Sequence, residues 1–66
     1  MKIKINGQEK NIKDGANIET AINEAGLCKD RVVVSVNDKV IEKRRFSETI
    51  LNDGDAIEVF SFVGGG

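Results

Sequence analysis

The first thirteen residues alternate between apolar and polar side chains on either side of a tight turn. Ile3 and Ile5 point one way and the neighbouring lysines the other, which predicts a half-buried strand over residues 1–5. Asn6-Gly7 follows, and both residues tolerate the positive φ angles of a type I′ turn. The pattern therefore predicts a hairpin whose second strand covers residues 8–13, with Ile12 as its clearest inward residue.

A helical pattern replaces this alternation after residue 16. Asn17 is a typical N-cap, and Glu19 lies in the first turn, where a negative charge complements the helix dipole. Gly26 fits the left-handed position after the last turn, which would bring Leu27 against Ile22. The apolar stripe that we expect to face the core consists of Ile18, Ala21, Ile22 and Ala25.

Strand patterns return after the predicted helix. Residues 31–37 form a predicted strand with Val32, Val34 and Val36 on one face and Val33 and Ser35 on the other. Asn37-Asp38 then turns the chain into a short segment around Val40 and Ile41. We expect an irregular or short helical stretch beneath the core next, anchored by Phe46, Ile50 and Leu51.

The last apolar run covers residues 56–63, after a turn at residues 52–55. The first and last strands can pair in parallel at the centre of a mixed sheet, and the helix can cross one face of that sheet. We therefore predict an α+β fold of the ubiquitin-like β-grasp type, with four to five strands and one helix. The predicted domain covers residues 1–63, and residues 64–66 form a predicted flexible glycine tail.

Size and composition exclude several classes of function. Sixty-six residues form one small domain, without room for both a core and a substrate cavity. The chain has no histidine, which is the commonest general base, so we expect no enzyme and no bound metal or cofactor. Ten basic and eleven acidic residues argue against nucleic-acid or membrane partners. A single cysteine fits a reducing cytoplasm.

The glycine tail is the most informative feature for function. Gly64, Gly65 and Gly66 directly follow the last apolar run, so a thin arm could carry the Gly66 carboxylate into another protein's active site. A frayed terminus or a linker is the alternative interpretation. Three extended residues reach on the order of 10 Å, which is enough to enter a narrow channel while the folded body stays outside.

An apolar surface at the base of the tail could dock that partner. Phe60 and Phe62 share one face of the last strand, and they point outward if Ile57 and Val59 face the core. Val33 can join them from the neighbouring strand. The alternative is that the aromatic rings bend back over an edge of the core.

Three other features have ordinary structural explanations beside functional ones. The cluster Lys43-Arg44-Arg45 could steer an acidic partner or contact a nucleotide, or it could be a solvated loop. Cys28 is interpreted as a partly buried structural thiol rather than a redox residue. Asp53 and Asp55 are explained by a turn, because the other ligands of a calcium loop are missing.

The sequence resembles the ThiS family, the small sulfur carriers of thiamin thiazole biosynthesis. The resemblance rests on the turn Asn52-Asp53-Gly54-Asp55, the strand at residues 57–63, the glycine ending and the segment Val34-Ser35-Val36-Asn37-Asp38. The family usually has a proline soon after the turn that follows this segment, where this chain has Lys43-Arg44-Arg45. Related carriers such as MoaD, and ubiquitin, also end in Gly-Gly.

This resemblance implies a protein co-substrate that is monomeric when free. A ThiF-like adenylating enzyme would use ATP to activate the Gly66 carboxylate, and a persulfide from a donor such as a cysteine desulfurase would convert it to a thiocarboxylate. A ThiG-like thiazole synthase would receive the sulfur. The alternatives are a carrier for molybdopterin or cysteine synthesis, a ubiquitin-like modifier joined through Gly66, and a plain binding module.

Overall fold

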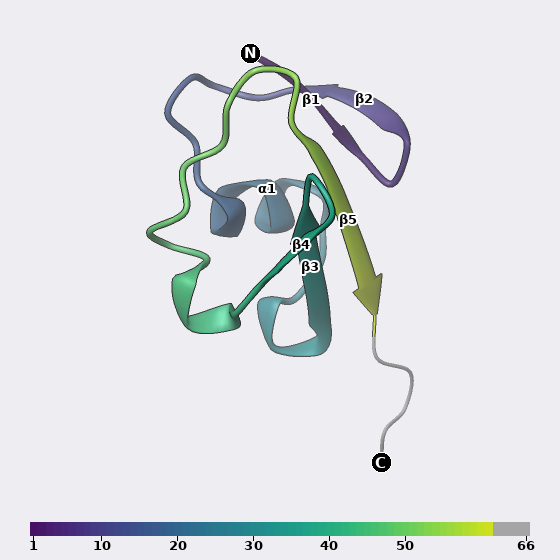
Figure 1. Cartoon of the computed structure of the whole chain (residues 1–66), viewed down its shortest axis with the longest axis vertical. Coiled ribbons are helices and arrows are strands. Elements are labelled where there is room, and N and C mark those ends of the chain that lie inside the picture. Colours follow the sequence, from purple (N-terminus) through teal and green to yellow (C-terminus); the bar gives the residue numbers. More distant parts are fainter. Residues whose placement is uncertain (62–66) are drawn as a thin grey trace.

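A computed structural model of the chain describes residues 1–61. It contains five strands, one α-helix and two short 3-10 helices (Figure 1). In chain order these are β1 (Lys2–Ile5), β2 (Gln8–Asn11), α1 (Ile18–Glu24), η1 (Lys29–Arg31), β3 (Val32–Val36), β4 (Lys39–Ile41), η2 (Lys43–Arg45) and β5 (Ala56–Ser61).

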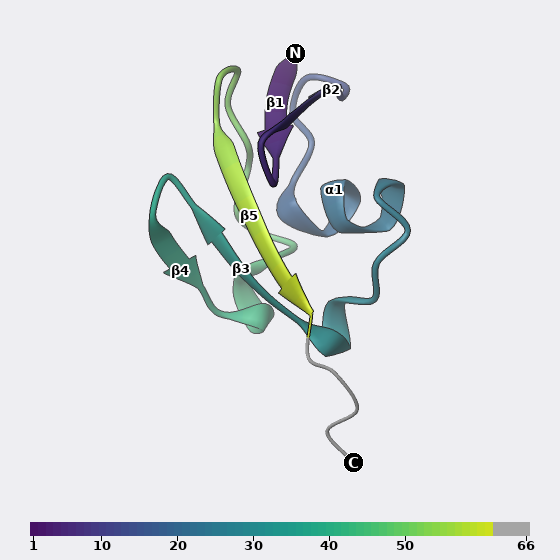
Figure 2. The same cartoon turned by 90° about the vertical axis from the view of Figure 1, so that its right-hand side faces the viewer.

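The five strands form one mixed sheet in the order β2-β1-β5-β3-β4. β5 lies at the centre, parallel to β1 and antiparallel to β3, as the sequence predicted. Helix α1 covers one face of this sheet (Figure 2). The outward-facing residues of β5 are exposed, so the opposite face of this strand is uncovered within residues 1–61.

Both predicted hairpin turns have the backbone geometry of type I′ turns. Asn6 and Gly7 have φ angles of 51° and 83°, and Asn37 and Asp38 have φ angles of 50° and 71°. β2 is shorter than predicted and ends at Asn11, although the next residue, Ile12, is buried as expected. The two turns place both hairpins beside β5.

Helix α1 begins and ends as its sequence predicts. The Asn17 side chain accepts a hydrogen bond from the Thr20 N–H at 2.8 Å. Gly26 has a φ of 77°, and the Leu27 N–H donates to the Ile22 carbonyl at 3.0 Å, which completes a Schellman motif. The predicted apolar stripe is buried except at its last position, where Ala25 is only half-buried beside the helix end.

The core lies between α1 and the sheet, and the segment 46–51 also contributes side chains to it. Phe46 and Leu51 are buried, as expected. Ile50 is not, because 54% of its surface is exposed, and its prediction as a core anchor was wrong. Neighbouring residues of an extended segment point to opposite sides, so only one residue of the Ile50–Leu51 pair can face the core. No helix within residues 1–61 is long and apolar enough to cross a membrane.

Candidate functional site

The end of β5 is the starting point for the candidate site. Ser61 is the last described residue, and it lies opposite Val32 in the antiparallel β3–β5 pair. The predictions for Phe62, Gly64, Gly65 and Gly66 lie outside the described residues. The candidate site is therefore described from the exposed surface around the C-terminal end of β5.

An exposed aromatic residue marks the uncovered face near this end. Ile57 and Val59 are buried against the core, whereas 58% of the Phe60 surface is exposed. Phe60 lies directly opposite Val33 in the β3–β5 register, so the two side chains share the face away from α1. The outward orientation of Phe60 and its pairing with Val33 agree with the sequence prediction.

The structure adds a third apolar residue that sequence reasoning missed. Val40 lies opposite Ser35, two positions along β3 from Val33, and 67% of its surface is exposed. Directly opposite residues of an antiparallel pair share a face, so Val40 is on the same side as Phe60. We call Val33, Val40 and Phe60 the outer patch. Alternation along Lys39–Ile41 could have predicted the outward position of Val40, because the next side chain, Ile41, packs against the core.

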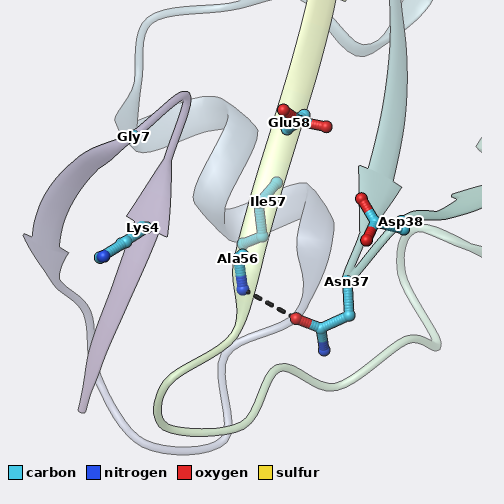
Figure 3. Close-up of a pocket in the computed structure, with 7 residues that line it drawn as sticks. All are labelled: Lys4, Gly7, Asn37, Asp38, Ala56, Ile57 and Glu58. Carbon is cyan, nitrogen blue, oxygen red and sulfur yellow. Dashed lines mark hydrogen bonds between the residues drawn. The ribbon is translucent and has the colours of Figure 1, made fainter.

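A charged hollow continues this face toward the start of β5. It has a volume of about 340 Å³, and Lys4, Asp38 and Glu58 contribute its charged groups (Figure 3). Glu58 lies on the central strand β5, Asp38 lies beside the end of β3 on one side of it, and Lys4 lies on β1 on the other side. The outer face thus combines an apolar patch with a charged hollow of mixed sign.

The basic cluster Lys43-Arg44-Arg45 forms the 3-10 helix η2, and its charges are paired locally. Lys43 Nζ lies 2.6 Å from Asp30 Oδ1, Arg44 Nε lies 2.6 Å from Glu42 Oε2, and Arg45 contacts Glu48 at 3.7 Å. These exposed pairs offset the positive charge of the cluster. The arrangement favours the solvated-loop interpretation over a cationic surface that steers a partner.

The contact between η1 and η2 also changes the titration of both partners. The hydrogen bond from the Lys43 ammonium, and then its positive charge, lower the pKa of the Asp30 carboxyl. The same hydrogen bond and the Asp30 charge raise the pKa of Lys43. Both side chains therefore stay charged at neutral pH and connect the two short helices.

Cys28 is exposed, so its prediction as a partly buried thiol was wrong. Leu27 takes the inward position of the Schellman motif and packs against the core. The chain is extended at Cys28, so the Cys28 side chain points to the side opposite Leu27, which is outward.

The two aspartates of the 52–55 turn accept hydrogen bonds from nearby backbone N–H groups. Asp53 Oδ1 accepts a hydrogen bond from the Lys2 N–H at 2.7 Å, and Asp55 Oδ2 accepts one from the Asn52 N–H at 2.8 Å. Within residues 1–61 no three histidine, cysteine or acidic side chains gather as a metal site would need. The turn interpretation accounts for both carboxylates.

Comparison with known proteins extends this picture to the part of the chain beyond Ser61. The sequence model of the ThiS family matches residues 3–66. The chain belongs to the ThiS family. The predicted resemblance is confirmed, and the family match includes the three terminal glycines as well as the described domain.

Individual ThiS relatives agree with this assignment. The sulfur carrier protein ThiS of Bacillus subtilis (strain 168) is 37% identical over 65 residues, covering 97% of this chain and 98% of that protein. A crystal structure of the thiamine biosynthesis protein ThiS from Geobacter metallireducens superimposes with a TM-score of 0.84 at 29% identity, covering 100% of both chains. The β-grasp prediction is thereby confirmed.

A second kind of relative is much longer than this ThiS family member. The thiazole synthase of Paramagnetospirillum magneticum (strain ATCC 700264 / AMB-1) is 35% identical over 66 residues. The match covers 100% of this chain but spans only 20% of the length of that synthase.

Proposed function

We propose that this chain is a sulfur carrier protein for thiamin thiazole synthesis and that Gly66 carries the sulfur. The observation that supports this most directly is the family match through residue 66, together with the end-to-end similarity to a sulfur carrier protein ThiS. In this proposal the chain is a protein co-substrate in the cytoplasm, and the catalytic groups and the bound ATP belong to its partners.

Activation would begin at the Gly66 carboxylate. A carboxylate oxygen attacks the α-phosphorus of ATP, and pyrophosphate leaves, which gives an acyl-adenylate. The terminal sulfur of a persulfide, supplied by a donor such as a cysteine desulfurase, then attacks the acyl carbon and AMP leaves. A second thiol attacks the donor-bound sulfur of the resulting acyl disulfide, so the S–S bond breaks, the acyl-bound sulfur leaves as the thiocarboxylate, and a disulfide forms between the donor and the second thiol.

A ThiF-like adenylating enzyme would have to perform the first step. The chain has no histidine in its 66 residues, and a free carboxylate needs an activated leaving group before sulfur can displace it. The partner must also exclude water from the acyl-adenylate, which a channel around a narrow glycine tail would achieve. The outer patch is the surface that we propose for docking, because Phe60 lies near the C-terminal end of β5 and the exposed apolar patch extends from it across β3 and β4.

A ThiG-like thiazole synthase is the acceptor that we propose. A thiazole synthase from another organism contains a segment that is similar to this whole chain. The occurrence of both segments in one polypeptide supports a working pair of carrier and synthase. This relation favours thiamin over molybdopterin or cysteine synthesis among the alternatives that the sequence left open.

The decisive experiment is the intact mass of the protein after incubation with ATP, its adenylating enzyme and a persulfide donor. We expect exchange of one oxygen for sulfur, located in the C-terminal peptide, and no exchange when Gly64, Gly65 and Gly66 are all deleted. Cys28→Ser is the matched control and should be modified as fully as the unaltered protein. An unmodified mass, or sulfur on Cys28, would contradict the proposal.

A further inference from the structure

Asn6 makes two hydrogen bonds to the strand that leads toward Gly66. Its side-chain Oδ1 accepts from the Val59 N–H at 2.9 Å, and its Nδ2 donates to the Val59 carbonyl at 3.3 Å. The two residues are 53 positions apart in the chain. The Asn6 side chain thus binds both backbone polar groups of one residue in β5, the N–H and the carbonyl of Val59.

The position of this contact follows from the parallel pairing of β1 with β5. The Lys4 N–H donates to the Asp55 carbonyl and the Asn6 N–H to the Ile57 carbonyl, both at 2.9 Å. In a parallel ladder, the Asn6 carbonyl would next accept from the Val59 N–H. The type I′ turn diverts that carbonyl, and the side-chain oxygen of the same residue takes over its role.

This contact extends the two-sided support of β5 beyond the end of β1. Backbone pairing with β1 runs only to Ile57, whereas pairing with β3 continues to Ser61. Without the Asn6 side chain, the stretch after Ile57 would be held along its β3 edge alone. Val59 is the last described residue of β5 with a partner on its β1 edge.

Asn37 makes an analogous contact at the other end of β5. It is also the first residue of a type I′ turn, with a φ of 50°. Its Oδ1 accepts from the Ala56 N–H at 3.1 Å (Figure 3), and its Nδ2 donates to Asp55 Oδ1 at 3.0 Å. Each asparagine oxygen therefore accepts from a backbone N–H of β5, Asn37 at the first residue of the strand and Asn6 nearer its C-terminal end.

We propose that Asn6 is a positioning residue for activation of the carrier. Its carboxamide holds β5 on both edges as far as Val59, so that the strand leads toward Gly66 in a fixed direction. This inference rests on the proposed function. The Asn6 side chain acts through β5 and does not itself contact the reacting carboxylate in this proposal.

The length of chain beyond the strand makes its direction important. Gly66 comes five positions after Ser61, and a fully extended chain of that length spans at most about 17 Å. A change of direction at Val59 is amplified over this distance. If β5 frays from Val59 onward in the free protein, binding to the partner must order it again, and that cost weakens binding rather than slowing the chemical step.

The test compares Asn6→Gly with Asn37→Gly in the full chain. Glycine accepts the positive φ of both turns, so each variant keeps its hairpin. Asn6→Gly loses its two bonds to Val59, and Asn37→Gly loses its bonds to the Ala56 N–H and the Asp55 side chain. We expect Asn6→Gly to raise the KM for ATP-dependent adenylation about tenfold, the scale of two hydrogen bonds, with little change in kcat. We expect Asn37→Gly to leave KM close to that of the unaltered protein.

Amide hydrogen exchange provides a readout that does not need the partner. In Asn6→Gly, exchange at Val59 and Phe60 should accelerate about tenfold, while exchange at Val34 in β3 should change little. In Asn6→Asp, the carboxylate can still accept from the Val59 N–H but cannot donate to its carbonyl. We therefore expect its KM and its exchange rates to lie between those of the unaltered protein and Asn6→Gly.

The possible results separate the inference from the proposed function. An equal rise of KM in both glycine variants, or no rise in Asn6→Gly, would overturn the positioning role. Unchanged exchange at Val59 in Asn6→Gly would overturn the support of β5 by this side chain. If the unaltered protein is not adenylated at all, the proposed function and the role of Asn6 in it both fail, whereas the exchange result still decides the structural part.

Discussion

Asparagine side chains connect local turns to distant parts of this small domain. Asn17 caps α1 through its oxygen and donates from Nδ2 to the Ser47 carbonyl at 3.0 Å. Asn6 and Asn37 do the same for β5 from two hairpin turns. A carboxamide suits these places because it can donate and accept at once, whereas an ionised carboxylate only accepts.

The helix cap gives a prediction at this scale. Asn17→Ala removes the hydrogen bond to the Thr20 N–H and the bond to Ser47, so it should lower the free energy of unfolding by about 1–2 kcal/mol. Urea unfolding monitored by circular dichroism measures the change. The control is Asn23→Ala on the exposed side of the same helix, which should stay within about 0.5 kcal/mol. Equal losses in both variants would contradict the capping role.

At the scale of elements, β5 connects two hairpins that do not otherwise form one sheet. Its inward side chains Ile57 and Val59 are buried in the core, and its neighbours are β1 on one side and β3 on the other. Packing along this one strand therefore contributes to the stability of the core where the two hairpins meet.

A pair of isoleucines tests that contribution. Ile57→Ala, at a side chain that is 1% exposed, should lower the free energy of unfolding by about 2–5 kcal/mol, because it removes buried surface and leaves a cavity. Ile50→Ala makes the same chemical change where 54% of the residue is exposed, and should cost under about 1 kcal/mol. Urea unfolding of both variants makes the comparison, and similar costs would contradict the assigned core.

The contact between η1 and η2 predicts a pH effect. Because Lys43 lowers the pKa of Asp30, this pair stabilises the fold at pH values above the ordinary pKa of an aspartate, and the contribution is lost as pH falls through the lowered value. The raised pKa of Lys43 means that its contribution is complete below the ordinary lysine pKa and is lost as pH rises through the raised value.

Carboxyl NMR titration measures the acid end of this effect. In Lys43→Gln, the Asp30 pKa should rise toward the ordinary aspartate value, and salt should reduce the shift in the unaltered protein, since the pair is exposed. Arg45→Gln is the control, because Arg45 contacts Glu48 instead. An Asp30 titration that is the same in all three proteins would contradict the pairing.

Local patterns predicted the elements well, and they failed where a side chain's surroundings depend on distant segments. The strands, the capped helix and the parallel β1–β5 pair follow from alternation, turn residues and the helical stripe. The exposure of Ile50 and Cys28 depends on which of two adjacent residues faces the core, and the local pattern did not decide this.

The candidate site was predicted only in part for the same reason. The pairing of Val33 with Phe60 could be expected because alternation gives each strand an outer face. The exposure of Val40 depends on β4 being an edge strand of the sheet that residues 1–61 form. The contact of Asn6 with Val59 depends on a register between segments 53 residues apart, which no local pattern contains.

At the scale of the whole molecule, one face of the sheet carries the helix and the other carries the outer patch. The three apolar side chains of this patch come from three different strands, and the charged hollow with Lys4 and Glu58 borders them. Two of these side chains, Val40 and Phe60, are more than half exposed, so they are available to a partner at little cost to the fold.

Docking can therefore be separated from folding by substitution. Phe60→Asp should leave the melting temperature almost unchanged and reduce kcat/KM for adenylation by at least about tenfold, because a charge would be buried in the interface. Ile50→Asp introduces the same charge at a similarly exposed isoleucine outside the patch and should be adenylated normally. Loss of folding in Phe60→Asp, or normal adenylation, would contradict the docking role.

The central place of β5 also has a consequence for folding of the chain during its synthesis on the ribosome. The strand that joins the two hairpins is the last of the five to be synthesised, so the sheet cannot close until residue 61 has left the exit tunnel. Until then β1 and β3 lack the strand that lies between them, and α1 has no complete surface to cover. A chain that stops early lacks its central strand, and with it the folded body that an activating partner would recognise.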